Sequence, residues 1–317
     1  MIFLLNYNFV LQKNFFLFFV LLLLLARASS LWNLSTPNTE IRKSELQAYT
    51  WIKNNTAQTS GYYDTKKPEY AILAYWDYGN QINYFAHRPV VANNMQNGVK
   101  NMADIFSSKD EETANKICEE LSIKYVFMTP DRVLFPSTID YWPAYQKFER
   151  APGYRALPYN VERSKDYENW FYSWLMKDFG LRRRGNFNVT SNFRIVFANS
   201  ESSSPSFSTM LFERVKGAKL VLKGKPNTVA SINFGFKVNN MFFNYHKEST
   251  TNENGYVTFV LPYSCYYNNG IVSTGELFDI SLISNETGRK IIGKVSIKEN
   301  DVITGNQVAT NSIILFK

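Results

Sequence analysis

The chain has 317 residues, 45% of them hydrophobic and 20% charged, so it is long enough for one large or two ordinary domains and apolar enough to bury a core. Two cysteines and two histidines exclude a disulfide-stapled scaffold and a zinc-finger or multi-histidine metal centre. The net charge of +8 suits nucleic acid, an anionic membrane surface or an anionic ligand, but the sharpest basic cluster, residues 182–184, lacks a nucleic-acid-binding signature and is interpreted as a solvated loop.

The N-terminus is strongly apolar. Residues 15–26 carry no charge, and Ala26-Arg27-Ala28 fits the cleavage site of a signal peptide. Residues 1–12 are also mostly apolar, so residues 1–26 would form one transmembrane helix if Lys13 is tolerated. We therefore expect residues 1–29 to be a hydrophobic helix that acts as a single-pass anchor in the cell membrane or as a cleaved signal. Both alternatives place residues 30–317 on the extracytoplasmic side.

Residues 30–191 alternate between helical and strand-like patterns. The patterns predict helices at residues 39–54, 99–106, 110–121 and 167–179, and strands at residues 70–76 and 124–128. In the third helix, apolar residues recur with helical spacing and include Cys118, which predicts a buried cysteine and not a nucleophile. The alternation predicts a mixed α/β domain with helices packed on a sheet.

Residues 192–317 have a different character. Short alternating runs predict strands at residues 193–197, 219–222, 229–236, 241–246, 256–260, 277–283 and 290–297. Asn239-Asn240 and Asn254-Gly255 mark turns between strands, and Asn-Gly is a strong hairpin signal. The pattern predicts an all-β sandwich or barrel domain, so the chain as a whole is expected to be α+β.

The sequence contains no nucleophile elbow, phosphate-binding loop, zinc-protease motif or D-x-D metal motif. The residues that stand out lie at the end of a predicted buried strand. They are Tyr75, Trp76, Asp77, Tyr78 and Gly79. A carboxylate can accept a hydrogen bond from a hydroxyl, and aromatic walls strengthen that bond by excluding water. The pattern suits recognition of a small hydroxylated side chain, although packed aromatics in a turn would give the same sequence.

This Y-W-D-Y-G motif and residues 85–94 resemble the W-W-D-Y-G signature and its downstream segment in oligosaccharyltransferase catalytic subunits, above all the archaeal AglB-type enzymes. Further segments resemble the same enzymes in the same order, at residues 48–55, 193–200, 212–218 and 254–264. The ordered set is far more specific than the motif alone. The chain is therefore similar to the C-terminal soluble region of these enzymes.

The resemblance implies that the motif binds the Ser or Thr of an acceptor sequon, N-x-S/T. Carried over residue by residue, the substrate-binding residues are Tyr75, Trp76 and Asp77, with Tyr78 and Gly79 in support. Tyr75 stands where the family has tryptophan. A phenol keeps an aromatic wall and a donor, but it places its hydroxyl differently from an indole N–H.

Two further departures from the family concern its second pocket motif and its catalytic membrane domain. The family's second pocket motif, an aspartate followed by a lysine, has no clear counterpart, because Asp131 is followed by Pro136 and by no lysine before Lys147. The family's catalytic carboxylates and its divalent metal, Mn or Mg, belong to a membrane domain of about a dozen helices for which this sequence has no counterpart. We therefore expect this chain to hold no catalytic residues and no metal or other cofactor of its own.

We expect an extracytoplasmic region that recognises acceptor polypeptides and resembles part of a glycosyltransferase of protein N-glycosylation. It would act only with a catalytic membrane subunit or a missing N-terminal half, and a split gene, a fragment and a decayed copy are all compatible with it. The alternative is a membrane-anchored or secreted surface protein that binds peptides or glycans. A third interpretation is a structural envelope component.

Overall fold

The computed structural model describes residues 41–62, 64–95, 97–129, 171–176, 190–199, 208–284, 288, 290–309 and 313–316. The predicted hydrophobic helix at residues 1–29, the basic cluster at residues 182–184 and the segment from Asp131 to Lys147 lie outside these ranges. Of the helix predicted at residues 167–179, the described residues 171–176 are helical. Within the described ranges, no helix has the length and apolar composition needed to cross a membrane.

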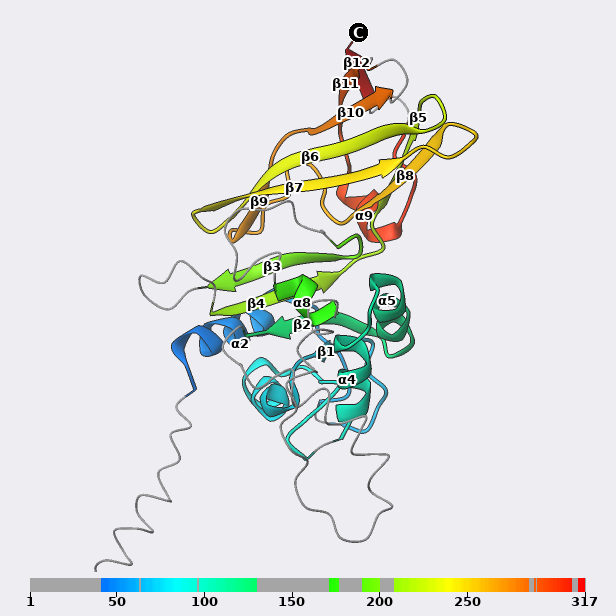
Figure 1. The fold of residues 1–317 in the computed structure, drawn as a ribbon. Coiled ribbons are helices and arrows are strands. Elements are labelled where there is room, and N and C mark those ends of the chain that lie inside the picture. The colour runs from blue at the N-terminus through cyan, green and yellow to red at the C-terminus, as the bar shows by residue number, and fades with distance from the viewer. Residues whose placement is uncertain are drawn as a thin grey trace, which may run out of the picture. The chain divides into compact units, whose positions relative to one another are not determined.

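A four-stranded mixed sheet forms the centre of the first half of the fold, in the order β1-β2-β4-β3 (Figure 1). Strands β1 (Ala71–Leu73) and β2 (Ile123–Met128) are parallel. Strand β4 (Thr209–Arg214) is antiparallel to both β2 and β3 (Phe193–Asn199). The sheet is therefore completed by two strands that come about 70 residues or more after β2 in the sequence.

Helices pack around this sheet as the alternating pattern predicts. They are α2 (Lys43–Asn55), α4 (Val99–Phe106), α5 (Glu111–Glu120) and the short α8 (Phe171–Met176). Helix α5 begins after Asp110, whose carboxylate accepts a hydrogen bond from the Thr113 N–H at 2.6 Å. Cys118 is fully buried on the inner face of α5, and burial raises the pKa of its thiol to about 12. The prediction of a buried cysteine is confirmed. The raised pKa disfavours the thiolate that a nucleophile needs.

The C-terminal part is rich in strands, as predicted. A six-stranded sheet has the order β12-β11-β10-β6-β7, with β9 paired to β6, and β5 pairs with β8 in a separate ribbon (Figure 1). The strands are β5 (Ala218–Lys223), β6 (Thr228–Val238), β7 (Met241–Thr250), β8 (Tyr256–Leu261), β9 (Val272–Thr274), β10 (Phe278–Ser284), β11 (Lys290–Val295) and β12 (Ile313–Phe316). A short helix, α9 (Glu299–Thr304), was not predicted.

Strand β3 is an edge strand, and side chains from the C-terminal part cover its open backbone. The Asn239 amide donates to the Ala198 carbonyl at 2.8 Å, and the Asn269 amide donates to the Val196 carbonyl at 2.8 Å. The Tyr263 hydroxyl accepts from the backbone N–H of residue 195 at 2.9 Å. An uncovered edge is a template for pairing with other chains, and these contacts remove it.

A buried arginine joins the same two parts of the chain. Arg194, on β3, is 2% exposed and lies 2.8 Å from a Glu213 oxygen and 2.7 Å from a Glu299 oxygen. The Ser264 hydroxyl also donates to Glu299, at 2.5 Å. Burial by itself raises the pKa of Glu299, but the hydrogen bonds and charge of Arg194 outweigh it, and the pKa lies below its ordinary value of 4.5.

The Glu299 carboxylate should make folding stability depend on pH. Its folded pKa lies below the unfolded value, so its contribution is fully present above pH 4.5 and is lost as pH falls through the folded pKa. Glu299→Gln should therefore lower the free energy of unfolding at neutral pH by about 1 kcal/mol, a small figure because the side chain is 44% exposed and partly screened. Urea titrations between pH 3 and pH 7 measure this change.

The matched control is Glu120→Gln, at the exposed end of α5. This variant should keep the pH dependence of the unmodified chain. If Glu299→Gln keeps it as well, Arg194 does not hold Glu299 in the way described.

Candidate functional site

The Y-W-D-Y-G segment forms a compact helical turn at the end of a buried strand. Strand β1 ends at Leu73, earlier than the predicted strand at residues 70–76, because a 3₁₀ turn begins at Trp76 and includes Asp77 and Tyr78. A short α-helical stretch, residues 79–81, and a π-helix, residues 82–86, continue the turn. Strand ends that lead into such turns display side chains at the edge of a sheet.

The side chains of the turn divide between the interior and the surface. Tyr75 and Tyr78 are buried, whereas Trp76 and Asp77 are half-buried and reach the surface. The rings of Tyr75 and Trp76 lie 5.7 Å apart with an interplanar angle of 48°. The turn thus carries the Asp77 carboxylate directly after an aromatic pair in the chain.

Tyr78 fastens the turn to the end of β2. The Thr129 hydroxyl donates a hydrogen bond to the Tyr78 hydroxyl at 2.9 Å, and Thr129 directly follows β2. The Tyr78 ring also packs on Phe127 of β2, with 5.4 Å between the ring centroids. Because β1 and β2 are parallel, their carboxyl ends meet at one edge of the sheet. The turn is therefore held at the edge where both strands end.

Gly79 allows the chain to return very close to the turn. A Cβ atom at this position would lie 2.2 Å from the Ala92 carbonyl oxygen and 2.6 Å from the Cα atom of Asn93. The next residue, Asn94, donates from its side-chain amide to the Asp77 carbonyl at 3.1 Å and accepts from the backbone N–H of residue 80 at 3.3 Å. Residues 92–94 thus pack against the turn and hydrogen-bond to its backbone.

Arg88 ties the two ends of the turn to helix α2. The side chain is fully buried, and its Nε lies 2.9 Å from the Thr56 hydroxyl and 3.0 Å from the hydroxyl of Tyr70, which directly precedes β1. Its terminal nitrogens donate to the carbonyls of Lys53, Thr56 and His87, at 3.1, 2.8 and 2.9 Å. The Arg88 cation also interacts favourably with the dipole of α2, because it lies at the C-terminal end of that helix.

Sequence reasoning placed Tyr75, Trp76 and Asp77 at the site but missed Arg88 and Asn94. The signal for Arg88 is a charged residue inside an otherwise apolar stretch, residues 85–92, which predicts a buried, fully hydrogen-bonded charge. Val90 lies outside the named strands and makes a single parallel bridge to Ile72 of β1. Within the described part of the chain, no three His, Cys, Asp or Glu side chains come close enough to hold a metal ion.

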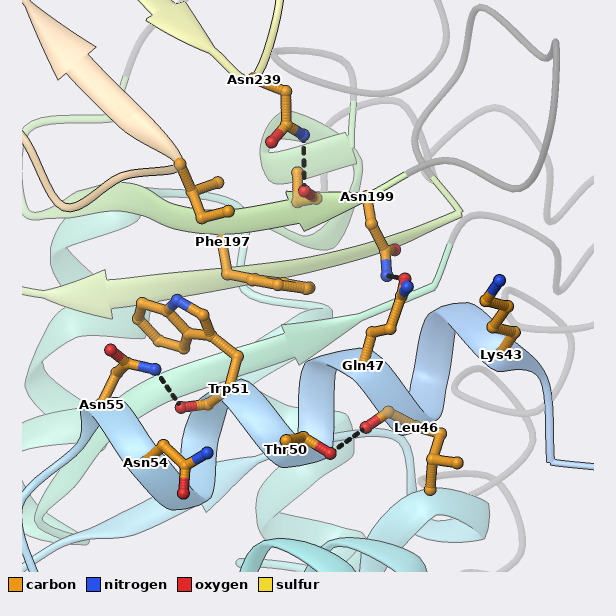
Figure 2. A pocket seen from close by; sticks show the side chains of 12 residues that line it. Lys43, Leu46, Gln47, Thr50, Trp51, Asn54, Asn55, Phe197, Asn199 and Asn239 are labelled. Atoms are coloured by element: carbon orange, nitrogen blue, oxygen red, sulfur yellow. Dashed lines mark hydrogen bonds between the residues drawn. The ribbon is translucent and has the colours of Figure 1, made fainter.

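Two grooves lie near these elements. The first, about 600 Å³ in volume, runs along the helical segment after the motif and is lined by Lys53, Tyr62, Asn80, Asn83, Tyr84, Phe85 and His87. The second, about 670 Å³ in volume, lies between α2 and β3 (Figure 2). Neither groove includes Tyr75, Trp76 or Asp77 among its lining residues.

Two protein-family models match this sequence. Residues 39–133 match the AglB core domain, and residues 217–308 match the long peripheral domain of archaeal glycosylation protein B. Dolichyl-phosphooligosaccharide-protein glycotransferase 2 of Archaeoglobus fulgidus is 38% identical over 92 residues, which are 29% of this chain and 16% of the relative. Glycotransferase 1 of the same organism is 34% identical over 87 residues, which are 27% of this chain and 15% of the relative.

Solved structures share the fold over most of the chain. One is archaeal oligosaccharyltransferase AglB from Archaeoglobus fulgidus in complex with an inhibitory peptide and a dolichol-phosphate, with a TM-score of 0.63 and 19% identity over 84% of this chain and 42% of that chain. Another is the Archaeoglobus fulgidus oligosaccharyltransferase tethered to an acceptor peptide containing the NVT sequon, with a TM-score of 0.62 and 19% identity over 84% and 43% of the two chains. This chain thus spans less than half the length of these proteins.

The tight packing around Gly79 makes it sensitive to a single added methyl group. Gly79→Ala should lower the free energy of unfolding by about 1–3 kcal/mol, because the Cβ would overlap the backbone at residues 92 and 93. The control is Gly235→Ala in β6, where a Cβ would have only one neighbour, at 3.9 Å, and where we expect a change within about 0.5 kcal/mol. Equal urea midpoints for the two variants would contradict the close approach.

The buried guanidinium is expected to be the strongest single support of the turn. Arg88→Met should lower the free energy of unfolding by about 3 kcal/mol or more, because several buried oxygens lose their donor. Urea unfolding followed by tryptophan fluorescence measures this loss. Lys100→Met, which removes only an exposed ion pair on α4, should cost about 0.5 kcal/mol or less. A loss from Arg88→Met as small as that from Lys100→Met would disprove the role.

Proposed function

We propose, from the matches of residues 39–133 to the AglB core domain and of residues 217–308 to the long peripheral domain of archaeal glycosylation protein B, that this chain recognises the hydroxyl of Ser or Thr in acceptor sequons, N-x-S/T. It would serve protein N-glycosylation as an oligosaccharyltransferase-like region. The observation that carries the proposal is the Y-W-D-Y-G turn at the edge of the sheet, in which the half-buried Asp77 follows the aromatic pair of Tyr75 and Trp76.

The chemistry of the turn supports recognition of a hydroxyl. The Asp77 carboxylate would accept a hydrogen bond from the hydroxyl, and a hydrogen bond to a charged acceptor is stronger than one between neutral groups. The rings of Tyr75 and Trp76 form the apolar wall next to it, while Tyr78 and Gly79 hold the backbone in place. The Tyr75 phenol takes the place of the indole donor of the family signature. A related structure holds a peptide with an NVT sequon, which is the ligand that this proposal assigns to the turn.

The proposal also assigns a domain organisation and a side of the membrane to the chain. Residues 1–29 would anchor it in the membrane or export it, residues 30–191 would form the domain that carries the motif, and residues 192–317 would form the β-rich domain, with both domains facing the outside of the cell. Transfer of the oligosaccharide would need the catalytic membrane domain of a partner or of a longer form of the protein. A related structure also contains a dolichol-phosphate, and a lipid-linked donor would belong to that membrane domain.

The divalent metal of the family would belong to the same catalytic membrane domain. The described residues do not fit it, because they bring together no three carboxylate, imidazole or thiolate side chains. We therefore assign to this chain the binding and positioning of the acceptor and derive no metal-dependent step from its residues. A surface protein that binds peptides without regard to the sequon is the alternative that the experiment below separates.

The test is a titration of the full chain, kept in detergent micelles, with two peptides that differ only in N-x-T against N-x-A. The unmodified chain should prefer N-x-T, and Asp77→Ala should remove a preference of about 1.5–3 kcal/mol, the value of a hydrogen bond to a charged group. Isothermal titration calorimetry measures both affinities. Asp104→Ala, which removes an exposed carboxylate on α4, is the control and should keep the preference. Equal binding of both peptides to the unmodified chain would refute sequon recognition.

A further inference from the structure

The groove between α2 and β3 is a second concave site, separate from the Y-W-D-Y-G turn. Its lining comes from α2 and β3, together with Asn239 and Ile271 of the C-terminal part. Figure 2 shows Asn239 across β3 from α2. Its volume of about 670 Å³ lies in the range of small-molecule sites. Part of its lining lies in the family-like segments at residues 48–55 and 193–200, but the proposed function does not use this groove.

An aromatic pair lines the groove. The Trp51 indole and the Phe197 ring lie 5.5 Å apart at an interplanar angle of 41°, and Figure 2 shows them next to each other. Phe197 is 5% exposed, whereas Trp51 is half-buried and reaches the groove. The indole N–H of Trp51 makes none of the hydrogen bonds found among the described residues, so it is available to a ligand. A partly exposed indole offers an apolar face and a donor at its edge.

Carboxamides supply most of the polar groups around the aromatic pair, and no lining residue carries a carboxylate. The carboxamide residues of the lining are Gln47, Asn54, Asn55, Asn199 and Asn239.

Much of the hydrogen-bonding capacity of these amides is unused. The Asn199 amide donates to the Gln47 oxygen at 3.0 Å, which leaves the NH₂ group of Gln47 as a free donor. Asn239 donates to a carbonyl of β3 and keeps its oxygen as an acceptor. Asn54 is exposed, and its side chain makes no hydrogen bond within the described part of the chain. The groove therefore presents mainly neutral donors and acceptors, with the exposed Lys43 as the charged residue of its lining.

The surroundings disfavour an extended peptide in this groove. A peptide that adds to a sheet uses the free backbone groups of the edge strand. On β3 three of its backbone groups are occupied, because Asn239 and Asn269 donate to two of its carbonyls and Tyr263 accepts from one of its N–H groups. With no carboxylate in the lining, the groove also has no counter-charge for a basic ligand.

We propose that this groove binds a neutral saccharide. A pyranose ring has an apolar face that stacks on an indole, and its hydroxyls both donate and accept hydrogen bonds, as the unused amide groups require. Trp51 would carry the ring, and Gln47, Asn54 and Asn239 would bind its hydroxyls. The site is independent of the sequon proposal, because it shares no residue with Tyr75, Trp76 or Asp77.

The test is saturation-transfer NMR on the full chain in detergent micelles, with chitotriose, maltotriose and mannotriose as probes. At least one probe should show transfer to its ring protons, and Trp51→Ala should weaken its binding by tenfold or more. Because Trp51 also packs on Phe197, Asn54→Ala at an exposed position provides a second variant that leaves the core intact. We expect it to weaken binding about threefold, as for the loss of a neutral hydrogen bond.

Tyr84→Ala is the matched control, because it removes an aromatic side chain that is 75% exposed and lies in the other groove. It should leave saccharide binding unchanged, as should saturation with an N-x-T peptide. The proposal is overturned if no probe shows transfer, if Asn54→Ala and Trp51→Ala both bind as the unmodified chain does, or if the peptide displaces the saccharide. None of these results bears on the preference for N-x-T over N-x-A.

Discussion

The buried guanidinium of Arg88 is the contact on which the geometry of the candidate site depends. It joins the end of α2, the residue before β1 and the residue after the π-helix, so one side chain holds the chain on both sides of the Y-W-D-Y-G segment. A buried charge is tolerated only where its donors are satisfied, and here carbonyl and hydroxyl oxygens satisfy them. The short strand β1 could not hold the turn in place by itself. Tyr78 and Gly79 then set the orientation of the turn against β2 and residues 92–94.

A second buried arginine plays a comparable role between the two halves of the fold. Arg194 binds carboxylates from β4 and α9, while amides of the C-terminal part cover the open edge of β3. The same covering shapes the groove beside α2, because Asn239 both closes the β3 edge and borders that groove. The polar contacts that join the two parts of the chain thus also create a surface with unused hydrogen-bonding capacity.

Local patterns predicted most elements but not their pairing. The strand at residues 124–128 and the helix at residues 110–121 match β2 and α5 closely, because each has a strong apolar period. Pairing of β2 with β4 joins residues more than 80 positions apart, and no local pattern specifies such a partner. The predicted strand at residues 70–76 is cut short at Leu73, since the turn is set by distant contacts to Thr129 and Ala92. Assignment of Tyr75, Trp76 and Asp77 to substrate binding stays a prediction.

The central claim is that the rigid turn presents Asp77 to the hydroxyl of an acceptor sequon. A crystal structure of the full chain bound to an N-x-T peptide tests it most directly. The account predicts the threonine hydroxyl within hydrogen-bonding distance of the Asp77 carboxylate, against the rings of Tyr75 and Trp76, with Arg88 in its present contacts. A peptide ordered elsewhere on the chain, with Asp77 making no contact to it, would contradict the account.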